Sequence, residues 1–227
     1  VGEYDKRVVI LTRELGKITA FARGARRMKS PLMAVSNPFV FGEFQVYEGR
    51  DSYTLSGANI KEYFLDLAQM QPGVYYGFYF LELAEYFGQE GNDETQMLNL
   101  LYVTMNAIRR GKQDLRLVRC IFELRTITIS GEAPQMFSCM ECGTKENLTV
   151  FSLRDSAIYC PNCGKTIRDP WPLQPGTVLA CRYIIAAPLA KLYGFTVNEE
   201  ILDELERLLR AYLHLSLIHI SEPTRPI

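Results

Sequence analysis

The sequence has very little histidine. Of its 227 residues only two are histidines, His214 and His219. Because histidine is the side chain that most often exchanges protons near neutral pH, a catalytic triad or a histidine base is disfavoured. The sequence also lacks the glycine-rich patterns of nucleotide-binding loops and the Gly-x-Ser-x-Gly pattern of hydrolases. No catalytic residue is predicted, and we expect a protein that is not an enzyme and takes no small-molecule substrate.

Long apolar runs are absent as well. No stretch of about 18 apolar residues is present, so no membrane span is predicted. No signal peptide is recognisable, and the spacing of the cysteines fits metal binding better than disulfides. Together these features predict a protein of the reducing cytoplasm.

The formal net charge is only −1, but the charge is unevenly distributed. Residues 1–30 contain eight Lys or Arg against three Asp or Glu, a net charge of +5. The remainder contains 17 basic and 23 acidic residues, a net charge of −6. Such asymmetry favours contact between the N-terminal part and a polyanion, whereas the alternative is an ordinary solvated basic face.

Both ends of the chain have unusual sequences. The first residue is Val1, not Met, and it lies close to an expected strand, which suggests that an earlier start is missing. Residues 215–227 resemble the translated end of a transposon-type sequencing adapter. We therefore expect residues 215–227 to be a non-native tail; a genuine, poorly ordered tail is the alternative.

The first 58 residues have the pattern of short β-strands. Apolar alternation predicts strands within residues 6–13, 16–22 and 39–47 and another from Ser52, joined by glycine-bearing turns. Residues 23–31, which we call the basic loop, separate the second and third of these strands and look mobile. Several antiparallel strands in so short a segment predict a small barrel of the oligonucleotide-binding (OB) class.

The rest of the chain is mostly helical. A helical pattern covers residues 59–70, and further helices are expected from Pro72, from Asn92 and from Asp114 to Ile129. After a proline-rich linker, helices are predicted at 176–191, with a break near Pro188, and at 198–214. The expected fold class is therefore α+β: an N-terminal domain, residues 1–58, and a helical domain, residues 59–214.

Four cysteines interrupt the helical domain in two matched pairs. Two-residue spacing within each pair lets a tight turn direct both thiolates at one ion, and a glycine follows each pair. Residues 148–153 and 157–159 form the expected hairpin between the pairs. The alternatives, two disulfides or a redox motif, fit the paired glycine turns less well. We predict a zinc ribbon at residues 136–168 that binds one structural Zn²⁺ through Cys139, Cys142, Cys160 and Cys163.

Basic and aromatic side chains in the N-terminal domain are candidates for contacts with nucleic acid. The basic loop contains Arg23, Arg26, Arg27 and Lys29, and four clustered cations favour phosphate binding over a purely structural role. Four aromatic residues could stack on bases, although core packing is the favoured interpretation for any one of them: Phe21, Phe39, Phe44 and Tyr47.

Several of these segments resemble one bacterial family. Residues 2–12, Gly-Glu-Tyr-Asp-Lys-Arg-Val-Val-Ile-Leu-Thr, are similar to the opening of RecO, the recombination mediator, as are Gly16-Lys-Ile and Ala22-Arg-Gly-Ala-Arg-Arg27. Leu55-Ser-Gly-Ala-Asn-Ile60 and the placement of four cysteines between helices also fit. The resemblance extends to about residue 214.

The resemblance implies an OB-fold that here lacks its first strand, followed by a helical domain with the zinc ribbon. It implies binding of single- and double-stranded DNA, annealing of complementary strands and help in loading recombinase onto coated single strands. The implied partners are RecR and the single-stranded-DNA-binding protein, at the bacterial nucleoid. By position, the four loop cations would contact DNA, with Arg7, Arg13 and Lys17 as weaker candidates.

Two other functions remain as alternatives. The chain could be a protein–protein scaffold with a structural zinc and no direct DNA role, which the net charge of −6 outside residues 1–30 would suit. A metal-dependent nuclease would need a second, oxygen-rich metal site. The sequence has no evident constellation of residues for one.

Overall fold

A computed structural model describes residues 2–50 and 52–216. Of the suspect segment 215–227, residues 215 and 216 continue the last helix, and residues 217–227, with His219, lie outside the described residues. The chain divides into two compact units, one ending at Met105 and the other beginning at Asn106. No helix in the described part of the chain is both long and apolar enough to span a membrane. The domains expected at 1–58 and 59–214 remain a prediction.

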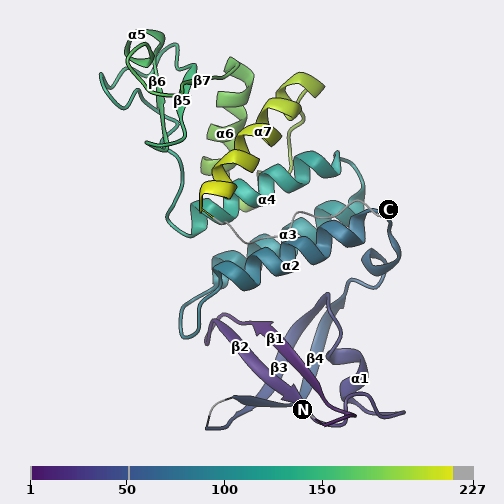
Figure 1. Ribbon diagram of the computed structural model, residues 1–227. Helices are drawn as coiled ribbons and strands as arrows, with labels where there is room; N and C mark the ends of the chain where they lie inside the picture. Colours follow the sequence, from purple (N-terminus) through teal and green to yellow (C-terminus); the bar gives the residue numbers. More distant parts are fainter. Residues whose placement is uncertain (1, 51, 217–227) are drawn as a thin grey trace. The chain divides into compact units, whose positions relative to one another are not determined.

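The first unit contains a four-stranded sheet (Figure 1). Its strands are β1 (Lys6–Leu11), β2 (Lys17–Ala22), β3 (Val40–Glu48) and β4 (Tyr53–Tyr63), in the order β1-β2-β4-β3. The hairpins β1–β2 and β3–β4 are antiparallel, whereas β2 and β4 pair in parallel. In the described residues β1 and β3 are the two edges, so the sheet is open and the expected closed barrel is not formed.

Strand alternation buries one face of this sheet. Ile10, Ile18 and Leu55 lie on that face and are almost completely buried. The short helix α1 (Leu32–Val35) packs against β4 and adds Leu32 and Val35 to the same core. The apolar side chains at every second position therefore face the core, as the sequence pattern predicted.

The helix expected at 59–70 is wrong: β4 continues to Tyr63 and is followed only by the 3₁₀ turn η1 (Leu67–Gln69). The β3–β4 ladder has register shifts between Phe41 and Gly42 and between Gln45 and Val46. Each shift resets the alternation along β4, because an extra residue is left unpaired. The apolar residues of β4 therefore show an irregular spacing that resembles a helical pattern.

The other predicted helices are present. In the first unit α2 (Gly73–Phe87) follows Pro72, and α3 (Thr95–Arg110) continues past the boundary between the units. In the second unit α4 (Leu115–Ile129), α6 (Pro175–Ala186) and α7 (Glu199–Ser216) pack against one another, and η2 (Leu189–Lys191) follows Pro188. Asp114 caps α4, because its side chain accepts a hydrogen bond of 2.7 Å from the backbone N–H of Arg116.

The cysteine segment forms a small three-stranded sheet within the second unit (Figure 1). It consists of β5 (Val150–Ser152), β6 (Ala157–Tyr159) and β7 (Trp171–Pro172) in the order β6-β5-β7, with the one-turn helix α5 (Pro161–Gly164). A hydrogen bond of 2.6 Å from Arg182 Nε on α6 to the carbonyl of Met136 ties the segment to the helices. The hairpin predicted between the cysteine pairs is thus present as β5 and β6.

Candidate metal centre and nucleic-acid interface

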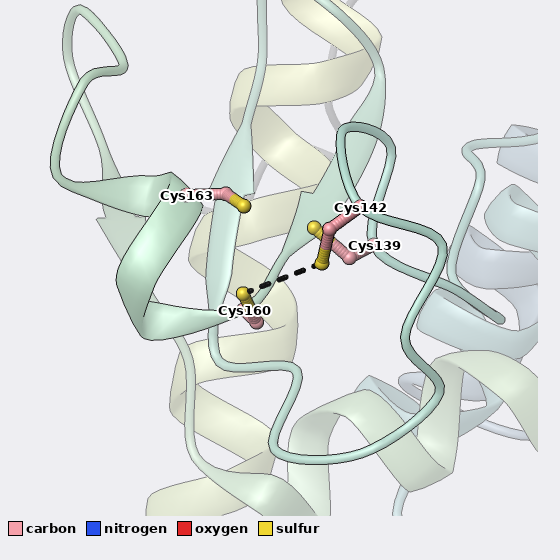
Figure 2. A group of neighbouring side chains, drawn as sticks. All are labelled: Cys139, Cys142, Cys160 and Cys163. Atoms are coloured by element: carbon pink, nitrogen blue, oxygen red, sulfur yellow. Dashed lines mark hydrogen bonds between the residues drawn. The ribbon is translucent and has the colours of Figure 1, made fainter.

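The four predicted cysteine ligands come together in space (Figure 2). Their Sγ atoms all lie within 4.8 Å of one another, and those of Cys142 and Cys160 are 3.9 Å apart. Cys139 and Cys142 belong to the turn before β5, Cys160 follows β6, and Cys163 lies in α5. In a tetrahedral zinc–thiolate centre with Zn–S bonds of about 2.3 Å the sulfurs lie about 3.8 Å apart, so this geometry fits such a centre.

Both cysteine turns depend on the glycines that follow them, but for different reasons. Gly143 donates a hydrogen bond of 2.9 Å to the Cys139 carbonyl and has a φ of +72°, a conformation that favours glycine. Gly164 donates one of 2.8 Å to the Cys160 carbonyl, and a Cβ there would lie 2.8 Å from the side chain of Val150. The second turn therefore needs glycine because it packs tightly against β5.

The backbone around the cluster favours thiolates. Burial opposes ionisation of Cys139, but backbone N–H groups, of Cys142 first and then of Cys160 and Glu141, lower its pKa to about 6. The backbone N–H of Cys163 likewise lowers the pKa of Cys160. By contrast, the side-chain hydrogen bond with Cys160 raises the pKa of Cys163 to about 12.

Four thiolates this close together would repel one another strongly, which favours a bound cation. A divalent ion that favours thiolates would neutralise the repulsion, so the donor set fits a closed four-sulfur metal site with no open position for a substrate. The other two cysteines are not part of it. Cys120 and Cys181 are buried in helices, and burial raises the pKa of both thiols.

The basic loop is held by the segment that precedes β1. The Asp5 carboxylate accepts a hydrogen bond of 2.8 Å from the backbone N–H of Gly24, and the Tyr4 carbonyl accepts one of 2.9 Å from that of Arg26. Gly24 adopts a φ of +67°, which suits the tight turn. The hydrogen bond from Gly24 is the main reason that the pKa of Asp5 is lowered. The loop expected to be mobile is therefore well organised.

All four cations of the basic loop are exposed. The Arg27 guanidinium lies over the ring of Tyr4, 5.6 Å from its centroid, and Arg26 Nη1 is 3.4 Å from the carbonyl of Glu3. Within residues 2–50 and 52–216, none of the four forms an ion pair with a carboxylate. Their charge is thus available to an anionic partner.

A row of side chains crosses the outer face of the sheet beside this loop. Arg7 on β1 pairs with Phe21 on β2, Phe21 pairs with Thr54 on β4, and Thr54 pairs with Tyr47 on β3. Directly paired residues point to the same side of a sheet, so the four form one continuous line. Tyr47 is 69% exposed, and Arg23 of the basic loop follows Phe21 by two residues.

The structure separates the remaining candidates. Phe39 is buried, with its ring 4.8 Å from that of Phe78, and Phe44 packs against the core of the sheet. Arg13 pairs with Glu14 at 3.4 Å. Lys17 donates a hydrogen bond of 2.7 Å to the Glu85 carbonyl, about 13 Å along β2 from Phe21. These four side chains therefore do not join the row and the loop.

Two residues of this surface, Thr54 and Asp5, were not predicted from the sequence. Thr54 completes the row, but its part depends on the parallel pairing of β2 and β4, for which the sequence gives no signal. Asp5 organises the basic loop from 19 residues away. The role of Asp5 could have been suspected because it is an acidic residue in a strongly basic segment.

The described residues bear on the nuclease alternative as well. Among residues 2–50 and 52–216, the four cysteines are the one group of at least three His, Cys, Asp or Glu residues close enough to hold a metal ion. The oxygen-rich metal site that a nuclease would need is thus absent from this part of the chain.

Two family models match the chain, and between them they cover most of it. The model described as "Recombination protein O N terminal" matches residues 1–64, and the one described as "Recombination protein O C terminal" matches residues 73–225.

Curated relatives match over nearly their full length. A protein from Alkaliphilus metalliredigens is 31% identical over 97% of this chain and 90% of its own length. One from Caldicellulosiruptor saccharolyticus is 30% identical over 95% of this chain and 87% of its own length, and one from Bacillus pumilus is 30% identical over 93% and 82%. Each carries the name DNA repair protein RecO.

Proposed function

Because the chain belongs to the RecO family of DNA repair and recombination proteins, we propose that it binds single- and double-stranded DNA and anneals complementary strands. In the same role it assists the loading of recombinase onto single strands coated by their binding protein. It acts as a mediator and not as a catalyst.

The observation that carries the DNA-binding proposal is the row Arg7, Phe21, Thr54 and Tyr47 beside the basic loop, in which Arg7 and Tyr47 are exposed and Phe21 and Thr54 are half-buried. Nonspecific single-strand binding combines cations that follow the phosphates with aromatic rings on which bases stack. This surface has both elements on one face of one compact unit. Thr54 adds a hydroxyl between the two rings.

Annealing on such a surface needs no catalytic group. Loop cations that neutralise phosphates on two strands reduce the repulsion between the strands and release counterions. Bases that are stacked only on rings keep their pairing edges free to find a complement. Duplex formation then supplies the free energy of the reaction.

We assign one Zn²⁺ to the four-cysteine cluster. When bound, the ion would act as a structural crosslink between the turn before β5 and the turn after β6, held by Cys139, Cys142, Cys160 and Cys163. Backbone N–H groups around Cys139 and Cys160 stabilise their thiolates and orient them for the metal.

Further parts of the proposal rest on the family. We assign the sheet to an OB-type domain, residues 1–58, followed by a helical domain, residues 59–214, that carries the ribbon. RecR and the single-stranded-DNA-binding protein are the proposed partners, and the bacterial nucleoid in the cytoplasm is the proposed site of action.

The proposal is tested by fluorescence anisotropy with labelled single-stranded DNA of mixed sequence. Replacing Arg26 and Arg27 by glutamine should weaken binding and reduce the slope of log K against log salt by about 1.4, since each phosphate contact contributes about 0.7. Tyr47→Ser should weaken binding by about 1 kcal/mol or more, because one stacking platform is lost.

Matched controls remove similar groups elsewhere. Arg154→Gln with Lys191→Gln removes two exposed cations of the second unit, and Tyr63→Ser removes an exposed tyrosine at the far end of β4. Both should leave the affinity and the salt slope nearly unchanged. An unchanged slope in the loop variant would refute the proposed contacts, and failure of the folded wild-type protein to bind DNA would favour the scaffold alternative.

A further inference from the structure

Helix α2 carries aromatic side chains on the face turned away from its core. Its buried face includes Phe80, Leu83 and Ala84. The opposite face exposes 36% of Tyr75, 53% of Tyr86 and 49% of Phe78, whose ring also packs on that of Phe39 at 4.8 Å between centroids. Helices that are apolar on both faces are normally covered on both. The solvent-facing aromatic stripe of α2 therefore has the character of a contact surface.

Two carboxylates lie on the same stripe. Glu82 and Glu85 are exposed, and the spacing 75, 78, 82, 85, 86 places all five side chains on one side of a helix with 3.6 residues per turn. Within residues 2–50 and 52–216, neither glutamate forms an ion pair. We call Tyr75, Phe78, Glu82, Glu85 and Tyr86 the acidic aromatic face.

The surrounding sequence makes this face unsuitable for DNA. Residues 31–105 contain ten Asp or Glu and only two Lys or Arg, although Lys17 of β2 reaches one end of the face, where its Nζ donates a hydrogen bond to the Glu85 backbone carbonyl. A phosphate backbone would be repelled there, whereas a cationic protein segment would be attracted. An aromatic ring next to a carboxylate is also well suited to a guanidinium, which can stack on the one and pair with the other.

A segment with the complementary properties is present in the same chain. In the basic loop, Arg26 and Arg27 precede Met28, which is 88% exposed, and Lys29 follows it. Met28 is a flexible apolar side chain that adapts to aromatic surfaces. An exposed methionine between cations matches a stripe of aromatic rings between carboxylates in both polarity and charge.

We propose that the acidic aromatic face of one molecule binds the basic loop of a second copy of this chain. Two different surfaces meet in this contact, so the association is head-to-tail and produces short open chains or a closed ring. One loop on one helix face is a small interface, which gives a dissociation constant on the order of tens of micromolar. The charge pairs make the association sensitive to salt.

The association has a consequence for the proposed function, and this consequence rests on that function. The loop cations that would contact DNA are those that bind the acidic aromatic face. DNA and a second copy therefore compete for the basic loop, and single-stranded DNA releases monomers from the chains.

Complementation between two variants tests the contact. Glu82→Gln with Glu85→Gln keeps the loop and weakens the face, and Arg26→Gln with Arg27→Gln keeps the face and weakens the loop. In sedimentation velocity at about 50 mM salt, wild type should associate as concentration rises, and each variant alone should associate roughly tenfold more weakly. An equimolar mixture of the two variants should form a 1:1 complex that grows no further.

The control Glu48→Gln with Glu132→Gln removes two exposed carboxylates elsewhere and should associate like wild type. Wild type that stays monomeric at all concentrations, or variants that associate unchanged, would overturn the proposal. So would a mixture that fails to form the 1:1 complex, because that would indicate a different contact.

Competition between DNA and the second copy is tested separately, by adding a short single strand to the assemblies. If a short single strand binds but leaves wild-type assemblies intact, competition for the loop is refuted, although the DNA function stands. If wild type associates and the mixture forms the complex but no DNA binds, the self-contact stands and the proposed function fails.

Discussion

At the scale of single residues, Arg116 has a concentrated set of ionic contacts. It lies on α4 and pairs with three carboxylates of α7: Glu199, Asp203 and Glu206, the last at 2.6 Å. The hydrogen bond with Glu206 is the main reason that the pKa of Arg116 is raised. Arg119, 2.9 Å from Glu206, extends the network, so a charged cluster helps to hold α4 against α7.

Arg116→Met should destabilise the protein by about 2–3 kcal/mol, since three neighbouring carboxylates lose their common cation and Glu206 is only 15% exposed. Denaturant unfolding followed by circular dichroism measures the change. Arg207→Met on the exposed side of α7 is the control and should cost less than about 0.5 kcal/mol. Equal losses in both variants would show that the network contributes nothing specific.

Two glycines with positive φ provide a matched test of how the β1–β2 hairpin packs. Gly16 has a φ of +65°, and a Cβ there would lie 2.0 Å from the Gln89 carbonyl oxygen in the loop after α2. Gly91 has a φ of +76° and open space around it. Lys17 donates a backbone hydrogen bond of 2.9 Å to Gln89, so the hairpin turn and the α2–α3 loop form one packed corner.

Gly91→Ala should cost about 1 kcal/mol from backbone strain alone, whereas Gly16→Ala should cost at least about 2 kcal/mol because a clash is added. Thermal unfolding of both variants measures the difference. Similar losses for the two would show that the corner yields easily and is not packed as described.

The hydrogen bond between Asp5 and the basic loop should make the stability of that loop depend on pH. The pKa of Asp5 is lowered, chiefly by the backbone hydrogen bond from Gly24, so the folded state holds the carboxylate ionised more strongly than the unfolded state does. The stabilisation is therefore fully present above the ordinary pKa of about 3.8 and is lost as the pH falls through the lower folded value.

In NMR titrations the Gly24 amide resonance should stay constant from neutral pH to about 5 and shift only below the ordinary aspartate pKa. Asp5→Ala should remove that transition and increase hydrogen exchange at Gly24 several-fold already at neutral pH. A Gly24 resonance in Asp5→Ala that still titrates as in wild type would assign the transition to another group.

At the scale of elements, the ribbon is the part that depends on metal. Its strands contain only two or three residues each, too few to be stable alone, and the four cysteines lie where its turns meet. The only tryptophan of the chain, Trp171, belongs to β7 and pairs with Phe151 on β5. Its fluorescence therefore reports on the ribbon.

Removing the metal with a chelator should shift Trp171 emission to longer wavelength and leave most helical circular dichroism intact, because α4, α6 and α7 have their own core. Elemental analysis should give one zinc per chain. Cys142→Ser should lose the metal, and the bystander variant Cys181→Ser should retain it. Metal retained by Cys142→Ser, or no change in Trp171 emission, would contradict a structural zinc ribbon.

Helices and strands differ in how far the sequence specifies them. Helix starts at Gly73, Leu115 and Glu199 follow from Pro72, Asp114 and Asn198, which act within one turn of chain. Strand β4 was partly mistaken for a helix because its bulges are defined by pairing with β3. Apart from the break in apolar alternation near Gly42 on β3, that pairing leaves no local mark in the sequence.

At the scale of the whole molecule, charge is separated along the chain and within the first unit. Residues 1–30 have a net charge of +5, whereas residues 31–105 carry ten acidic and two basic residues. Both segments belong to the unit that ends at Met105. One compact unit thus presents a cationic loop and an acidic helix face, which is the basis of the proposed DNA site and of the proposed self-contact.

The sequence by itself determined the cysteine cluster, the starts of the helices after Pro72 and the family. These features depend on neighbouring residues or on motifs: two Cys-x-x-Cys pairs, caps, and the N-terminal block with its loop cations. The fold could be predicted to the level of an N-terminal sheet and a helical remainder. Whether the sheet closes into a barrel could not be predicted from the alternation of apolar residues, because closure depends on which strand edges pair.

Only the tertiary structure decided which candidates share a surface. Phe21 and Tyr47 lie in the row on the outer face of the sheet, whereas Phe39 is buried and Phe44 packs against the core of the sheet, although all four have the same aromatic character in the sequence. The difference arises from the register of β2, β3 and β4, which is set by hydrogen bonds between distant residues. Such pairing is a property of the folded chain, and no local pattern encodes it.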